Sequence, residues 1–381
     1  MNYCDLLEKD KFISALENKN IIEIHISLDP DIKVIKDFFN VTILCENHNI
    51  KKSINLYGYN DIISYEIIET LDDFLKQHKM IIKIALRCVE MDLNCSERFN
   101  KLLINNNHIV ELEFIDNIKL SYETILENIP LQKLKVYSPN SIEMSKILLF
   151  PLIESLNIHL DCNEFDERYY NKQLQNAFRN TKSLTDIYID NSFENKNRKF
   201  NKIIVSFLKS KNQSVKNFSI HLEKKFSKKK LHEEIMEYIQ QNKNIKTFSI
   251  SDSISNYDFL NKNDTIEELK IFNDKMYDDT IKSLENLILE NKKIIKLEIG
   301  NIPNVRQCKI LIRAIKKNGT IEKLSALYGE INNEWKNLLK EVEDIKKLKR
   351  QHILKYLDLF ASYQILPMIS IIDEYVGLNI K

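Results

Sequence analysis

Cysteine and histidine are the side chains in this sequence best suited to metal binding or nucleophilic chemistry. The six cysteines are Cys4, Cys45, Cys88, Cys95, Cys162 and Cys308. None forms a Cys-x-x-Cys pair, and the set is typical of reduced, mostly buried thiols in a reducing compartment. Cys88 and Cys95 flank Asp92, which would allow a metal or redox pair; a coincidence beside a helix is the favoured interpretation.

The eight histidines are scattered, and the motifs that mark hydrolases, metalloproteases and nucleotide-binding enzymes do not occur. The sequence has no His-Glu-x-x-His, no Gly-x-Ser-x-Gly and no glycine-rich phosphate loop, and it holds only five glycines. We therefore predict no catalytic residues, no metal site and no cofactor. The chain is interpreted as a non-enzyme.

Lysine is concentrated at 224–230, where five lysines surround Phe226. They are Lys224, Lys225, Lys228, Lys229 and Lys230. An anionic ligand such as a phosphoinositide or RNA is one interpretation, and a solvated helix start balanced by nearby glutamates is the favoured one. The whole chain has 56 Lys+Arg against 55 Asp+Glu, a formal charge of +1, which disfavours a dedicated nucleic-acid binder.

Neither end of the sequence indicates a membrane segment. Met1-Asn2-Tyr3-Cys4-Asp5 lacks the basic and apolar regions of a cleavable signal peptide, and no uncharged apolar run is long enough to span a bilayer. We expect a cytoplasmic protein, or one delivered into a host cell without a cleavable signal.

A short pattern of three apolar residues, which we call the phrase, recurs along the chain, most often with the spacing i, i+3 and i+5. It predicts the elements that would position any site. The last two apolar positions of the twelve copies are Ile24/Ile26, Ile54/Leu56, Ile84/Leu86, Leu112/Phe114, Leu134/Val136, Leu156/Ile158, Ile187/Ile189, Phe218/Ile220, Phe248/Ile250, Leu269/Ile271, Leu297/Ile299 and Leu324/Ala326. Their alternation predicts strands with one buried face. From Ile81 onward, successive copies begin 21 to 31 residues apart.

The segments between the phrases have the period of amphipathic helices. Ile281, Leu284, Leu287 and Ile288 line one such face. One strand with one helix cannot bury its own apolar side chains, but stacked copies can, with a parallel sheet inside and helices outside. The fold class is therefore α/β, with a concave sheet and convex helices.

The phrase Asn-x-x-Ile-x-x-Leu-x-Ile, clearest at 106–114 and 291–299, resembles the ribonuclease-inhibitor-like class of leucine-rich repeat proteins. That resemblance implies a horseshoe solenoid of about 11–12 irregular repeats with helical caps, and at fold level it extends to effectors of intracellular pathogens. In the family an Asn after each strand holds the turning backbone, and Asn117 stands at that place here. The matching places hold Asp29, Asp161, Ser192, Ser253 and Asp274, whereas Val89, Pro139, Glu223 and Ile302 depart from the pattern.

The predicted division has three parts: an N-terminal helical cap at 1–18, the repeat solenoid at 19–330 and a C-terminal helical cap at 331–381. The capping helices are expected at 3–17, 351–364 and 368–376, the last two separated at Pro367. Residues 366–376, which begin Leu-Pro-Met-Ile, also resemble the first helix of an F-box. That resemblance implies an alternative function, a substrate adaptor that recruits a ubiquitin-ligase scaffold.

Strand geometry selects the candidate site. Residues between the buried apolar positions must point out of the concave face, and large aromatic, Arg and charged side chains there are typical of protein interfaces. The selected residues are Tyr57, Arg87, Glu113, Lys135, Tyr137, His159, Tyr188, His221 and Phe272. The enrichment of Tyr and Phe in strands is the competing explanation. The leading hypothesis is a non-enzymatic scaffold that binds a partner protein through this face.

Overall fold

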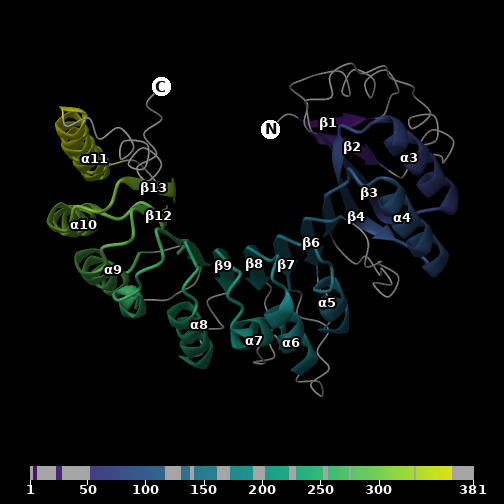
Figure 1. Cartoon of the computed structure of the whole chain (residues 1–381), viewed down its shortest axis with the longest axis horizontal. Helices are drawn as coiled ribbons and strands as arrows, with labels where there is room; N and C mark the ends of the chain where they lie inside the picture. The colour runs from purple at the N-terminus through teal and green to yellow at the C-terminus, as the bar shows by residue number, and fades with distance from the viewer. Residues whose placement is uncertain are drawn as a thin grey trace. The chain divides into compact units, whose positions relative to one another are not determined.

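The computed structural model describes residues 3–6, 23–27, 52–115, 130–137, 141–160, 172–191, 202–222, 229–251, 256–273, 276–329 and 332–362. Short strands alternate with helices along the chain, so the fold is α/β (Figure 1). The chain divides into two compact units, residues 1–245 (unit 1) and residues 246–381 (unit 2).

Unit 1 contains a sheet in which each strand pairs in parallel with its neighbour in sequence. Within the described residues its strands are β1 (Tyr3–Leu6), β2 (Glu23–Ser27), β3 (Lys52–Ile62), β4 (Ile81–Glu90), β5 (Glu111–Ile115), β6 (Lys133–Tyr137), β7 (Ser155–His159), β8 (Asp186–Asn191) and β9 (Asn217–Leu222). The register aligns the apolar phrases, so that Leu134 lies beside Leu156 and Val136 beside Ile158.

The helices of unit 1 cover one face of this sheet (Figure 1). They are α3 (Tyr65–Gln77), α4 (Leu93–Asn105), α5 (Ser141–Ile147), α6 (Lys172–Asn180), α7 (Lys202–Ser210) and α8 (Lys229–Gln241). Their apolar stripes are buried against the phrase residues, and Phe207 contacts the rings of Phe178, Phe218 and Tyr238 in this core. Among the described residues of unit 1, the opposite face carries no helix, and we call it the helix-free face.

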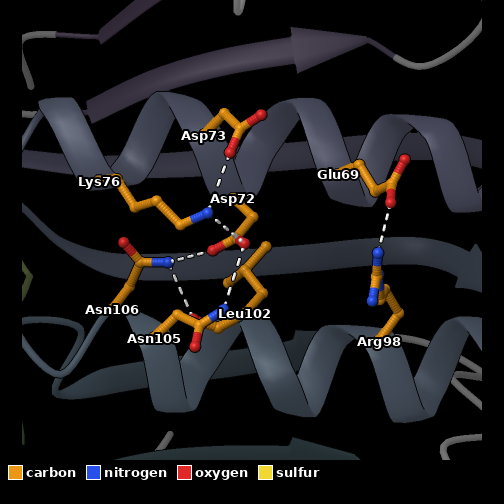
Figure 2. A network of polar contacts seen from close by, with 8 residues as sticks. All are labelled: Glu69, Asp72, Asp73, Lys76, Arg98, Leu102, Asn105 and Asn106. Atoms are coloured by element: carbon orange, nitrogen blue, oxygen red, sulfur yellow. Dashed lines mark hydrogen bonds and ion pairs between the residues drawn. The ribbon is translucent and has the colours of Figure 1, made fainter.

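Polar contacts join α3 to α4 on the outer side of unit 1 (Figure 2). Asn106 Nδ2 donates to Asp72 Oδ1 at 2.6 Å, and Lys76 Nζ lies 2.9 Å from Asp72 Oδ2. Arg98 pairs with Glu69 further along the same two helices. The Lys76–Asp72 pair lies within α3, whereas the contacts of Asn106 with Asp72 and of Arg98 with Glu69 join neighbouring repeats and set the register of α4 against α3.

Unit 2 repeats the same arrangement with strands β10 (Thr247–Ser251), β11 (Glu268–Ile271), β12 (Lys296–Asn301) and β13 (Lys323–Tyr328). Its helices are α9 (Asp278–Glu290), α10 (Val305–Asn318), α11 (Asn333–Ser362) and the 3-10 turn η2 (Asp258–Leu260). Helix α10 packs between α9 and α11. The buried stripe of α11 contains Trp335, Leu338 and Val342.

The predicted α/β solenoid is confirmed. All twelve apolar phrases form strands, and the sheet is parallel, open and covered by helices. Membership of the leucine-rich repeat family, the ribonuclease-inhibitor-like class and the horseshoe curvature stay predictions.

Asparagine side chains hold the corners where helices lead into strands. Asn291 is buried, and its Nδ2 donates to the carbonyls of Leu260 and Asn263 in the preceding repeat, at 2.8 and 2.9 Å. Its Oδ1 accepts from the amides of Lys293 and Ile294. Asn212, Asn242 and Asn318 also bridge to the preceding repeat. The first Asn of the phrase Asn-x-x-Ile-x-x-Leu-x-Ile therefore connects one repeat to the preceding one by hydrogen bonds.

Two helix predictions need correction. The helix expected at 3–17 is wrong at its start, because Tyr3–Leu6 form β1 and take their backbone partners from β2. The helix expected at 351–364 is also wrong at its start, because α11 begins at Asn333 and runs to Ser362 without a Pro or Gly to stop it. The division at 1–18, 19–330 and 331–381 stays a prediction.

Several predicted features lie outside the described residues. These are the F-box-like segment 366–376, the corner residues Asp29, Asn117, Asp161, Ser192, Ser253 and Asp274, and positions 224–228 of the lysine cluster.

Candidate functional site

Three charged residues on neighbouring strands form an ion triplet on the helix-free face of unit 1. Lys83 on β4 and Lys135 on β6 both approach Glu113 on β5, each with an Nζ–Oε distance of 2.6 Å. The side chain of Glu113 is only 8% exposed, so its carboxylate is held between the two ammonium groups. The parallel register brings Glu113 directly beside Lys135.

The triplet fixes the charge state of its members. Burial alone would raise the pKa of Glu113, but the hydrogen bonds and charges of Lys135 and Lys83 bring it below its ordinary value. Burial would likewise lower the pKa of Lys135, and contact with Glu113 raises it instead. Both groups are therefore ionised at neutral pH, and the triplet carries a net positive charge.

Aromatic rings continue the row from β6 to β8. Tyr137 and His159 stack with ring centroids 4.3 Å apart and an interplanar angle of 5°. Tyr188 follows with a centroid 5.8 Å from His159. Lys135 Nζ lies 5.3 Å from the Tyr137 centroid, which places a cation over the ring and joins the aromatic group to the ion triplet.

A carboxylate lies at the far end of the row. Asp190 on β8 is 3.1 Å from His159 Nδ1 and 3.8 Å from His221 Nδ1, which belongs to β9. Burial, followed by the charge of Asp190, raises the pKa of Tyr188 to about 12. The phenol of Tyr188 therefore stays protonated and can donate a hydrogen bond at neutral pH.

These contacts define what we call the polar strip. It consists of Lys83, Glu113, Lys135, Tyr137, His159, Tyr188, Asp190 and His221. The strip crosses six neighbouring strands, about 24 Å at the usual strand spacing. It offers a positive end, an aromatic middle and a carboxylate end, which suits it to recognition by hydrogen bonds, ion pairs and ring contacts.

The remaining predicted residues lie apart from the strip. Tyr57 and Arg87 are register partners on β3 and β4, and both are half-buried on the helix-free side. Among the described residues, Arg87 Nε has no hydrogen-bond partner. Phe272 follows β11 and belongs to unit 2, so its place in the candidate site stays a prediction.

Two members of the strip were not selected from the sequence. Lys83 pairs in register with Glu111, two residues before Glu113. Alternation places this earlier position on the outward face as well. Asp190 shares a column with His159 and His221, and a carboxylate between two histidines in register was the signal that could have found it.

The alternative of a metal or redox pair at Cys88 and Cys95 stays a prediction, because the side chain of Cys88 lies outside the described residues. Cys95 is buried at the start of α4, where its amide donates to the cap residue Asp92, and burial raises the pKa of its thiol to about 11. A thiol with that pKa is a poor nucleophile. Over the described part of the chain, no group of three or more His, Cys, Asp or Glu residues could hold a metal ion.

Within the same residues, every helix is too short or too polar to cross a bilayer.

Solved structures similar to this chain include an internalin and a part of leiomodin-1. An internalin, InlF, from Listeria monocytogenes str. 4b F2365 is 13% identical over 82% of this chain and 82% of its own, with a TM-score of 0.36. The actin-binding site 2 of leiomodin-1 is 17% identical over 41% of this chain and 96% of its own, with a TM-score of 0.32. No protein-family model and no curated protein matches the chain.

Proposed function

We propose that this chain is a non-enzymatic scaffold that binds a partner protein through the polar strip of unit 1. The observation that carries the proposal is the continuity of the strip: aromatic and charged side chains on six successive strands contact one another on a face that none of the described helices covers. Tyr and Arg are the residue types that dominate binding energy at protein interfaces.

The internal pairing of the strip also supports recognition. Glu113 is held by two lysines, and Tyr137 and His159 are held by each other, so the side chains lose little rotamer freedom when a partner binds. Preorganised side chains of this kind raise affinity by lowering the cost of ordering the interface. Arg87 and Tyr57, on the strands beside the positive end, would extend the contact area.

The internalin and the leiomodin domain agree with a binding role only at the level of architecture. The adaptor alternative depends on residues 366–376, outside the described part of the chain, and stays a prediction of the sequence. So do the cytoplasmic location, the effector role and the anionic ligand at 224–230.

Site-specific photocrosslinking tests where a partner binds. Benzoylphenylalanine replaces Tyr188 in the strip, and in a matched control it replaces Tyr277, a 57% exposed tyrosine before α9. In extracts of the native cell, we expect a discrete crosslinked protein from position 188 and not from position 277. Equal crosslinking at both positions, or none at 188, would contradict the proposal.

Alanine variants then measure the contribution of single residues. Arg87→Ala and Tyr137→Ala should each weaken the affinity for the crosslinked partner by about 1–3 kcal/mol, because truncation removes buried contact area at the interface. Tyr277→Ala should leave the affinity unchanged. Isothermal titration gives the affinities, and a melting curve for each variant separates lost contacts from lost folding. Unchanged binding in both strip variants would rule out this face as the site.

A further inference from the structure

Helix α10 displays five cations and no carboxylate. Arg306, Lys309, Arg313, Lys316 and Lys317 are all exposed on its outer side, whereas Cys308, Leu311 and Ile315 face the core. A solvated helix of a neutral chain normally mixes both signs of charge, so this composition is unusual for a face without a partner.

Helix α11 continues the positive charge beside α10. Over residues 333–355, whose side chains the structure describes, its exposed side carries Lys336, Lys340, Lys347, Arg350 and Lys355, against a single exposed carboxylate, Glu343. At 100° per residue these positions fall on one side of the helix, opposite the buried stripe that contains Trp335 and Leu338. The row from residue 336 to residue 355 is about 28 Å long.

The carboxylates between the two helices do not neutralise this surface. Lys309 Nζ lies 3.8 Å from Glu334, and Lys316 Nζ lies 3.0 Å from Glu341. These pairs use the carboxylates at the α10–α11 contact. In the described part of unit 2, Arg313, Lys317 and the five exposed cations of α11 form no ion pair.

We define the basic face by the ten cations above, five from each helix. Exposed apolar side chains lie on the same helices: Leu348 is 54% exposed and Leu354 is 50% exposed, on the outward side of α11 between its basic residues. Val305 at the start of α10 is 48% exposed. A surface that mixes lysine, arginine and exposed leucine matches the composition of helices that lie in a membrane interface.

We propose that the basic face of α10 and α11 binds the surface of an anionic lipid bilayer. The cations would meet the negative headgroups, each with a modest electrostatic gain that sums over the face. Leu348 and Leu354 would enter the layer below the headgroups, where their apolar surface leaves water. The surface lies wholly within unit 2, so the proposal is independent of the polar strip.

The leucines favour a bilayer over other polyanions. A nucleic acid or an acidic polypeptide offers charge to the cations and no apolar layer to the leucines. Among the side chains of α10 and α11 that the structure describes, no Phe, Tyr or Trp is exposed for a base to stack on. Whether the leucines contribute to binding therefore distinguishes a lipid bilayer from other polyanions.

The test is flotation of the full chain with vesicles of phosphatidylcholine, with and without phosphatidylserine. We expect binding only to vesicles that contain phosphatidylserine, weakened by added salt because the cations are exposed. Lys347→Glu/Arg350→Glu/Lys355→Glu should lower the partition coefficient by at least about tenfold. A control, Lys101→Glu/Lys182→Glu/Lys216→Glu, makes the same change in net charge at exposed positions of unit 1 and should bind like the unchanged protein.

A second variant, Leu348→Ser/Leu354→Ser, tests the apolar contribution alone, because it alters no charge. We expect weaker binding to phosphatidylserine vesicles with an unchanged circular dichroism spectrum and melting curve. Three results would overturn the proposal: no preference for phosphatidylserine, an equal loss in the unit 1 control, or full binding by the leucine variant together with competition by poly(U) or polyglutamate.

Discussion

His108 lies in an environment that disfavours the charged form of its imidazole. It lies at the corner between α4 and β5, and neither ring nitrogen has a hydrogen-bond partner among the described residues. Burial, followed by the charge of Lys79, lowers the pKa of His108 to about 4. An imidazole in this setting is neutral in the folded protein.

This environment predicts a loss of stability in mild acid. Because the folded pKa lies below the ordinary value of 6.5, the unfolded chain binds more protons between about pH 4 and about pH 6.5. The contribution of His108 is fully present above this window and is lost as the pH falls through it, by about 2 kcal/mol. Urea unfolding at a series of pH values measures this change.

Substitution isolates the contribution of the imidazole. His108→Leu should flatten the pH dependence of unfolding in this window, because the variant has no imidazole to protonate. His352→Leu, at an exposed position of α11, removes an imidazole that is not buried and serves as the matched control. A profile that keeps its slope in the His108 variant would assign the acid sensitivity to other groups.

At the scale of elements, the asparagine corners connect one repeat to the next. Asn291→Ala should lower the free energy of unfolding by about 2–4 kcal/mol, because two carbonyls and two amides lose their side-chain partner at a buried corner. Chemical denaturation measures the loss. Asn337→Ala removes an exposed Asn of α11 and should change stability by less than about 0.5 kcal/mol.

Asn291→Asp gives a further comparison at the same corner. The carboxylate keeps the two acceptor contacts with Lys293 and Ile294 but cannot donate to Leu260 and Asn263. We expect it to destabilise the protein at least as much as alanine. Stability equal to that of the unchanged protein would show that the donated bonds contribute little.

The strands could be predicted from the sequence because their signal is local and repeated. Each phrase alternates apolar and polar residues, and burial of one face leaves a single register. Strand β1 was missed because it has one alternation only, Cys4 and Leu6, and it depends on pairing with Ile24 and Ile26 of β2. The length of α11 was missed because residues 348–355, the described part of its second half, include no buried residue, and helix-forming Lys, Leu and Arg maintain the helix there.

The candidate site could be predicted only in part. Alternation identified the outward columns, and the register confirms that Glu113 lies beside Lys135 and Tyr137 beside His159. Which of these side chains touch depends on rotamers and on the neighbouring column, which sequence spacing does not specify. Lys83 and Asp190 entered the strip through such contacts.

At the scale of the whole molecule, each repeat packs mainly on its sequence neighbours. In unit 1, α3 packs on α4 and α6 on α7, and in unit 2, α9 packs on α10 and α10 on α11. Stability in such arrays is close to a sum of repeat terms and nearest-neighbour terms, so a local lesion should act most on the repeats beside it.

Trp335, the one tryptophan of the chain, is buried in α11 and reports on unit 2 by fluorescence. Asn291→Ala, at the corner between α9 and β12, should lower the urea midpoint seen by Trp335 by roughly 1 M. Asn212→Ala, an equivalent lesion between α7 and β9 in unit 1, should lower it less, while circular dichroism of the whole chain still records destabilisation. Equal shifts of the Trp335 transition in the two variants would mean that the chain unfolds as one cooperative block, and the nearest-neighbour description would then be wrong for this protein.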